Sequence, residues 1–191
     1  MSKVRLYLVR HGKTMFNTIG RAQGWSDTPL TTEGELGIHE LGIGLRESGL
    51  QFDRAYSSDS GRTIQTMGII LEELGLQGKI PYRMDKRIRE WCFGSFDGAY
   101  DGDLFMGLIP RIFNVDHVHQ LSYAELAEGL VEVDTAGWAE GWEKLSGRIK
   151  EGFEAIAKEM EEQGGGNALV VSHGMTIGTI VYLINGMHPH G

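Results

Sequence analysis

The sequence has little cysteine and no long hydrophobic run. Its single cysteine, Cys92, cannot form a disulfide within the chain, which excludes a disulfide-stabilised fold. The longest apolar stretch, Ile177 to Met187, is broken by Asn185 and glycines, so it falls short of the ~18 apolar residues of a membrane span. No apolar signal segment follows Met1. We therefore expect a cytoplasmic protein without a membrane partner.

Positive charge is also scarce. The 18 Lys and Arg residues are outnumbered by 26 Asp and Glu residues, which gives a formal net charge of −8. Nucleic-acid binding relies on clustered basic residues, so we expect no nucleic-acid partner. The contents of 41% hydrophobic and 23% charged residues are typical of a chain that buries a core. A length of 191 residues then fits one domain, 1–191, carrying a lid.

Alternating strand and helix patterns predict an α/β fold. Short apolar runs predict buried strands at 4–9, 53–57, 79–84 and 168–171. Apolar residues at helical spacing predict helices at 31–49, 60–75, 138–160 and 175–184. This alternation implies a mostly parallel sheet covered on both faces, a three-layer α/β/α sandwich. The irregular stretch that follows the third strand predicts a lid insertion at about 95–135. Trp138 is expected on the buried stripe of the longest helix.

Polar side chains follow three of the predicted strands at their carboxyl ends. They are the side chains of Arg10, His11, Ser58, Arg62 and His173, and Gly174 adds a backbone amide beside them. Ligands of an open α/β sheet bind beyond these ends. Two imidazoles and two guanidiniums repel one another unless an anion lies among them, and the arginine fork suits phosphate oxygens. The sequence therefore predicts a phosphate-binding pocket.

A metal site is the alternative interpretation of two converging histidines. The neighbouring arginines repel a cation, and no H-E-x-x-H motif or cysteine cluster supplies further ligands. His117 and His119 have the spacing of a ligand pair, but nothing nearby completes a tetrahedral set, so we expect them in a solvated part of the lid. We therefore expect neither a metal nor another cofactor.

Four sequence blocks, in order along the chain, carry a family resemblance. They are LYLVRHGKTMFN with QGWSDTPLTTEG (6–34), AYSSDSGRTIQT (55–66), IREWCFGSFDG (88–98) and VVSHGMTI (170–177). Together they resemble the histidine phosphatase superfamily, in the branch that contains the cofactor-dependent phosphoglycerate mutases. The resemblance implies an α/β sandwich core, a phosphohistidine intermediate and no metal.

The resemblance also implies roles for individual residues. His11 matches the nucleophile, and Glu90 matches the group that first donates a proton and then activates water. Burial beside Trp91 and Phe93 would raise the pKa of Glu90, whereas the alternative is an exposed carboxylate paired with an arginine. The groups expected around the phosphoryl oxygens and the substrate are Arg10, Arg62, His173, Asn17, Gln23, Gly24, Ser58 and Gly174.

Phosphatases and mutases of this family share the pocket and differ in whether water or an alcohol meets the phosphohistidine. The loop after Arg89 reads Glu-Trp-Cys-Phe-Gly, whereas the family's mutases carry Glu-Arg-His-Tyr-Gly there. The predicted lid offers Arg111, and no further arginine precedes Arg148. We therefore expect a phosphatase for a small phosphorylated metabolite with an apolar or bulky part. A mutase is the alternative, followed by a non-catalytic phosphate-binding relative.

Two further expectations concern the ends and the surface of the chain. The sequence stops at Gly191, soon after the helix that follows His173, whereas family members usually continue through another strand. We therefore expect a C-terminal part to be missing. An exposed strand or the lid surface could support a homodimer.

Overall fold

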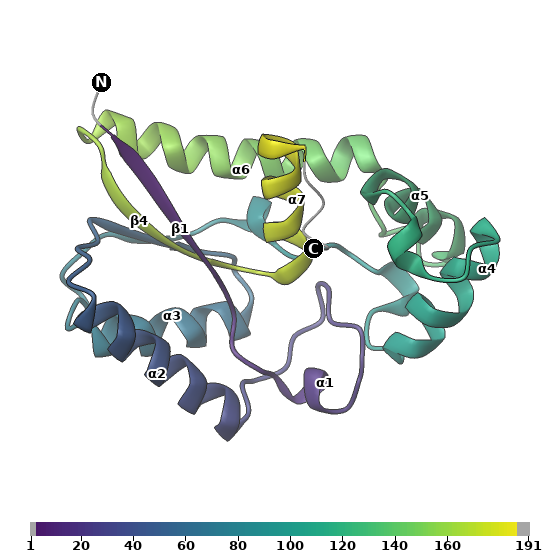
Figure 1. The fold of residues 1–191 in the computed structure, drawn as a ribbon, viewed down its shortest axis with the longest axis horizontal. Helices are drawn as coiled ribbons and strands as arrows, with labels where there is room; N and C mark the ends of the chain where they lie inside the picture. Colours follow the sequence, from purple (N-terminus) through teal and green to yellow (C-terminus); the bar gives the residue numbers. More distant parts are fainter. Residues whose placement is uncertain (1–2, 187–191) are drawn as a thin grey trace.

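The computed structural model describes residues 3–186 and places a four-stranded sheet between two layers of helices (Figure 1). The order of the strands across the sheet is β1-β4-β2-β3, and all three neighbouring pairs are parallel. This confirms the predicted α/β/α sandwich, and it brings the carboxyl ends of three neighbouring strands to one edge. The strands are β1 (Val4–Arg10), β2 (Arg54–Ser57), β3 (Tyr82–Met84) and β4 (Gly166–Ser172).

Two hydrophobic cores lie on the two faces of the sheet. Leu169 and Val171 of β4 belong to the core under α2 and α3, whereas Ala168 and Val170 belong to the core under α6. Successive side chains of a strand point to opposite faces, so β4 is buried on both sides. Figure 1 shows the two helical layers on either side of the sheet. The long helices are α2 (Thr32–Glu47), α3 (Gly61–Glu73), α6 (Trp142–Glu162) and α7 (Gly174–Asn185).

The start of the longest helix differs from the prediction. Helix α6 begins at Trp142, and Trp138 lies in the preceding turn with 66% of its surface exposed. The carboxylate of Asp134 accepts hydrogen bonds from the amides of Ala136, Trp138 and Ala139 in this turn. These bonds compete with helix formation, so the expectation that Trp138 is a core residue was wrong.

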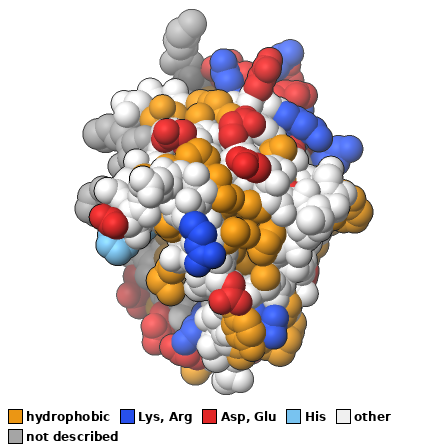
Figure 2. Space-filling view, turned by 90° about the vertical axis from the view of Figure 1, so that its right-hand side faces the viewer, with side chains coloured by type: hydrophobic (Ala, Val, Ile, Leu, Met, Phe, Trp, Pro, Cys, Tyr) orange, Lys and Arg blue, Asp and Glu red, His pale blue; other side chains and the backbone are white. Residues whose placement is uncertain are grey.

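The segment predicted as an irregular lid is mostly helical and packs at one end of the sandwich (Figure 1). A π-helix of seven residues has no 3.6-residue period, which explains why the pattern of apolar residues concealed it. Figure 2 views this end of the molecule and shows a band of hydrophobic side chains between charged ones. The helices of the segment are the π-helix Gly102–Leu108, α4 (Ile109–Phe113) and α5 (Tyr123–Val133).

Two further features complete the fold. A short helix, α1 (Met15–Thr18), follows β1 and precedes the long loop to α2. Within residues 3–186, no helix has the length and apolar character that would let it span a membrane.

Ile149 tests the packing of α6 against the sheet, because its side chain is fully buried. We expect Ile149→Ala to lower the free energy of unfolding by roughly 2–5 kcal/mol, since the change removes buried methyl groups and leaves a cavity. The matched control is Lys150→Ala at the next, exposed position, with an expected effect within about 0.5 kcal/mol. Urea unfolding measures the change in the free energy of unfolding for both variants. Equal effects of the two substitutions would contradict the packing described here.

Candidate active site

Two histidines lie side by side where β1 and β4 end. His11 directly follows β1, and His173 directly follows β4, and these strands are paired in register from Val4 to Arg10. The two imidazole rings are 5.4 Å apart between centroids. The backbone amide of His11 donates to the carbonyl of Ser172 at 3.1 Å, which fixes one loop against the other. The parallel pairing of β1 and β4 therefore brings the two predicted histidines together.

Arg62 joins the two histidines from the first turn of α3. Its side chain is fully buried. Its Nε donates to Nε2 of His11 at 3.3 Å, and its Nη2 donates to Nδ1 of His173 at 3.0 Å. The remaining donors reach the Asp27 carboxylate at 3.0 Å and backbone carbonyls within residues 23–26. A guanidinium has no acceptor, so these bonds fix which nitrogen of each histidine carries a lone pair.

The lone pair of His11 is on Nε2. Its Nδ1 lies 2.8 Å from the carbonyl oxygen of Gly12, and a carbonyl can only accept, so Nδ1 carries the proton. Burial lowers the pKa of His11 to about 4, and the Arg62 and Arg10 charges act in the same direction. His11 is therefore neutral at pH 7 with a lone pair on Nε2, which is the protonation state of a nucleophile.

His173 has the opposite tautomer. Since Nδ1 accepts from Arg62, Nε2 carries the proton and donates to the Ser58 hydroxyl at 2.7 Å. Ser58 lies 2.8 Å from the hydroxyl of Thr63, which donates onward to a backbone carbonyl. Burial is the largest cause that lowers the pKa of His173 well below its ordinary value, and the Arg62 charge adds to this effect. A chain of buried hydroxyls therefore orients this ring.

Glu90 is buried at the N-terminus of α7. Its carboxylate oxygens lie 3.2 Å from the amide of Met175, 3.0 Å from the amide of Thr176 and 3.1 Å from the Thr176 hydroxyl. Burial raises the pKa of Glu90, although these donors and Arg62 act against the rise. Arg87 and Arg89 pair with other carboxylates, those of Asp85 and Asp59 among them, which excludes the interpretation of Glu90 as an exposed ion-pair partner. Burial therefore favours the protonated form of Glu90, which is the form that a general acid needs.

Six of the predicted residues line one cavity of about 500 Å³. Within residues 3–186 the guanidinium of Arg10 and the amide of Gly174 have no hydrogen-bond partner, so both can donate to a ligand. Asn17 accepts a hydrogen bond from the Thr14 amide through its Oδ1, which leaves its NH₂ group for a ligand. The six residues are Arg10, His11, Asn17, Gln23, Glu90 and Gly174.

The other four predicted residues lie behind this wall. Arg62 and His173 act on the cavity through the contacts just described. Ser58 is fully buried, accepts from Nε2 of His173 and lies 2.8 Å from the Thr63 hydroxyl, so the structure places it where it orients His173. Gly24 does not line the cavity either. Its amide donates to Asp97, and a Cβ there would collide with the Trp91 carbonyl, so glycine is needed for close packing.

Part of the cavity wall consists of residues that were not predicted from the sequence. Arg21 and Asp101 line the cavity, and so does His119, which was expected in a solvated segment. Arg21 lies four residues after Asn17, between the two quoted segments of the first sequence block. Its position close to the predicted site residues could have identified it. The rest of the wall is mainly apolar, and most of it comes from the lid. Its residues in the lid are Phe105, Met106, Val118, Leu121, Tyr123 and Leu126, and those outside the lid are Phe93 and Met175.

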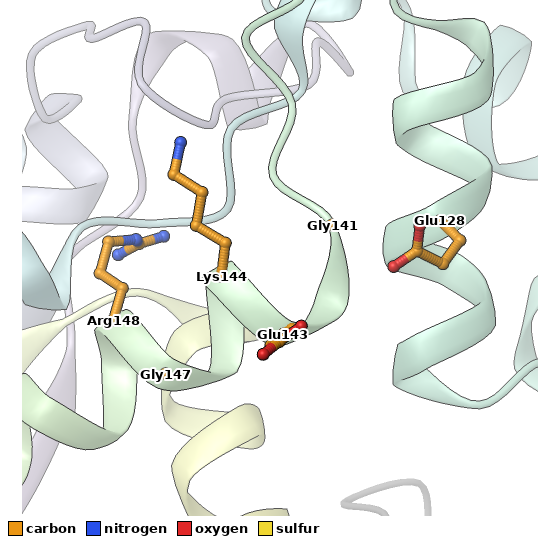
Figure 3. A pocket seen from close by; sticks show the side chains of 6 residues that line it. All are labelled: Glu128, Gly141, Glu143, Lys144, Gly147 and Arg148. Atoms are coloured by element: carbon orange, nitrogen blue, oxygen red, sulfur yellow. The ribbon is translucent and has the colours of Figure 1, made fainter.

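A second hollow, of about 610 Å³, lies between α5 and the start of α6 (Figure 3). Its walls carry carboxylates and cations, but they carry no histidine and no hydroxyl or thiol nucleophile. The larger hollow therefore lacks the chemistry of the cavity at His11. Its lining residues are Glu128, Gly141, Glu143, Lys144, Gly147 and Arg148.

Arg148 lies on one wall of that hollow (Figure 3). Its side chain connects α6 to the loop that carries Glu90. Its guanidinium donates to the backbone carbonyls of Arg87 at 2.9 Å, Arg89 at 3.1 Å and Glu90 at 3.3 Å. The buried carboxylate of Glu140 pairs with it at 2.8 Å. These contacts make Arg148 a positioning residue for Glu90.

No metal-binding cluster of three or more His, Cys, Asp or Glu side chains occurs within residues 3–186. The donors around His11 are cationic or neutral, which suits an anionic ligand rather than a cation.

Comparison with known proteins identifies the family of the chain. The family model described as histidine phosphatase superfamily (branch 1) matches residues 6–191. The chain belongs to this superfamily. A Salmonella choleraesuis protein named "Probable phosphoglycerate mutase GpmB" is 32% identical over 186 residues, which are 96% of this chain and 76% of that protein. The family resemblance of the four sequence blocks is confirmed.

Solved structures also share the fold of this chain. A phosphoglycerate mutase from Bacillus anthracis is 37% identical, with a TM-score of 0.89 over 97% of this chain and 82% of that one. YhfR from Bacillus stearothermophilus is 26% identical, with a TM-score of 0.72 over 95% of this chain and 80% of that one. The three-layer sandwich of this chain is therefore shared with these solved structures.

The tautomers of the two histidines can be measured directly. We expect His11 to carry its proton on Nδ1 and His173 on Nε2 at pH 7, because their partners are a carbonyl and a guanidinium respectively. Long-range ¹H–¹⁵N NMR spectra of the imidazole nitrogens report the tautomer of each ring. The signals are assigned by their loss in the His11→Ala and His173→Ala variants. The same tautomer at both rings, or a protonated ring at either position, would contradict the arrangement.

Proposed function

We propose that the protein is a phosphatase that hydrolyses small phosphomonoesters through a phosphohistidine on His11. The observation that carries the proposal is the neutral His11, which lines the cavity together with Arg10 and a buried Glu90 whose pKa is raised. Such a combination supplies a nucleophile, donors for phosphoryl oxygens and an acid for the leaving group.

In the first step, Nε2 of His11 attacks phosphorus and the bond from phosphorus to the ester oxygen breaks. The leaving oxygen takes the proton of Glu90, so an alcohol departs rather than an alkoxide. The positive charge that develops on the ring is held by the Gly12 carbonyl at Nδ1. Arg10, the Asn17 amide group and the Gly174 amide donate to the equatorial oxygens, where the transition-state charge resides.

In the second step, water attacks the phosphohistidine. The Glu90 carboxylate, having lost its proton, takes one from the water, and the bond between phosphorus and Nε2 breaks. Inorganic phosphate leaves, and both His11 and Glu90 return to their starting protonation states. One buried carboxyl group serves both steps, which is why its raised pKa matters.

The composition of the cavity favours hydrolysis over phosphoglycerate mutation. A phosphoglycerate needs cations for its carboxylate, yet Arg111 lines a different hollow, and Arg148 is engaged by Glu140 and backbone carbonyls. The part of the wall that the lid supplies is mainly apolar, which suits a phosphomonoester with an apolar or bulky alcohol part.

A mutase is the second candidate. Two specific observations favour it: the names of the Salmonella and Bacillus anthracis relatives, and the presence of Arg21 on the cavity wall. In that case the phosphoryl group of His11 would pass to an alcohol of the bound substrate instead of water.

A panel of phosphomonoesters that includes 3-phosphoglycerate separates the two candidates. We expect release of inorganic phosphate in the presence of a metal chelator, fastest for substrates with apolar alcohol parts. His11→Ala should lower this rate by at least about 1,000-fold, because it removes the nucleophile.

The matched control is His39→Ala, which removes a histidine of α2 that pairs with Glu73. It should retain the wild-type rate. Exchange of phosphoglycerate isomers without net phosphate release would establish the mutase instead. Phosphate release that survives in His11→Ala would refute a mechanism through this residue.

A further inference from the structure

Asp101 is the acidic residue of the cavity wall that the mechanism does not use. It stands at the start of the π-helix, where an aspartate commonly caps the first amides, but its side chain makes no capping hydrogen bond. The side chain lines the cavity instead. Within residues 3–186 its carboxylate has neither a hydrogen bond nor an ion pair. A carboxylate in this position is available to a ligand.

The backbone holds Asp101 firmly at this point. Its amide donates to the carbonyl of Gly20 at 2.9 Å, and the preceding residue, Tyr100, forms an antiparallel bridge with Arg21. The π-helix that follows is anchored by Leu104, which is fully buried. The position of the carboxylate is therefore set by the fold and not by a flexible loop.

The surroundings make an uncompensated carboxylate unfavourable. The neighbouring wall residues from the lid, such as Phe105 and Met106, are apolar, and burial raises the pKa of Asp101 without an opposing contact. A phosphomonoester brings further negative charge into the same cavity. The electrostatic cost falls if the other end of the ligand supplies a positive charge or hydrogen-bond donors.

We propose that Asp101 selects the alcohol part of the substrate, favouring one that bears an amine or hydroxyl donor on an otherwise apolar body and disfavouring one that bears a carboxylate. This inference rests on the proposed function, because the phosphate bound at His11 directs the alcohol part toward the lid. It names the substrate class more closely: cationic or hydroxylated phosphomonoesters rather than phosphorylated acids.

Arg21 is the competing group on the same wall. Its Nη1 donates to the carbonyl of Gly98 at 2.6 Å, and its guanidinium lies 4.3 Å from the centroid of the Tyr100 ring. These contacts hold the cation against the protein. If Arg21 nevertheless governed selection, a carboxylate would be preferred, which is the opposite of the preference assigned to Asp101.

Three non-hydrolysable ligands test the inference: benzylphosphonate, its 4-aminomethyl derivative and its 4-carboxy derivative. We expect the wild-type chain to bind the amine about 10-fold more tightly than the neutral compound and the carboxylate about 10-fold more weakly, as measured by titration calorimetry. In Asp101→Asn both differences should shrink to about 2-fold or less. Asparagine has nearly the same size, and no contact within residues 3–186 is lost.

The matched control is Asp103→Asn, which removes the same charge from an exposed position of the same π-helix. It should keep the wild-type order of affinities. An order unchanged in Asp101→Asn, or a wild-type preference for the carboxylate, would overturn the role of Asp101. Absence of binding by all three phosphonates would overturn it as well.

Hydrolysis of phenyl phosphate, measured in parallel, separates this inference from the proposed function. Turnover without a charge preference in binding would refute the role of Asp101 alone. A charge preference that depends on Asp101, without turnover of any phosphomonoester, would refute the phosphatase and leave the selection of ligands by Asp101 standing.

Discussion

Arg62 places a positive charge between two histidines at a point closed to solvent, and the rest of the site is arranged around it. Its hydrogen bonds fix the lone pairs of His11 and His173, and Asp27 with backbone carbonyls of residues 23–26 compensates the charge. Without Asp27 and those carbonyls, a fully buried guanidinium would carry a large desolvation cost. The loop that surrounds Arg62 is therefore as much part of the site as the residues that face the cavity.

Burial shifts the pKa values of the nucleophile and the acid in opposite directions. It disfavours the charged form of each group, so it lowers the pKa of His11 and raises the pKa of Glu90. A neutral imidazole and a protonated carboxyl group are the states that the first chemical step requires. A single physical effect, the exclusion of water from the edge of the sheet, thus prepares two groups for different tasks. Arg148 supports this arrangement from α6 by holding the carbonyls of the loop that carries Glu90.

The sandwich and the catalytic edge could be predicted because their residues follow strands directly. His11 and His173 come after apolar runs, and parallel strands end at the same edge. The roles of Ser58 and Gly24 could not be predicted, because they depend on which face of a loop meets its neighbours. The place of Asp101 on the cavity wall could not be predicted, because the π-helix that follows it lacks the 3.6-residue period of an α-helix. The exposed position of Trp138 could not be predicted either, because hydrogen bonds to Asp134 hold the preceding turn and the helix begins four residues later.

The pH dependence of kcat/KM for phosphomonoester hydrolysis tests the opposed protonation states most directly. Activity should fall in acid as His11 takes up a proton with a pKa of about 4, and it should fall in alkali as Glu90 loses its proton. In Glu90→Gln the alkaline limb should vanish, and the rate should be roughly 100-fold or more lower. An acid limb near the ordinary imidazole value of 6.5, or an alkaline limb that persists in Glu90→Gln, would contradict the account.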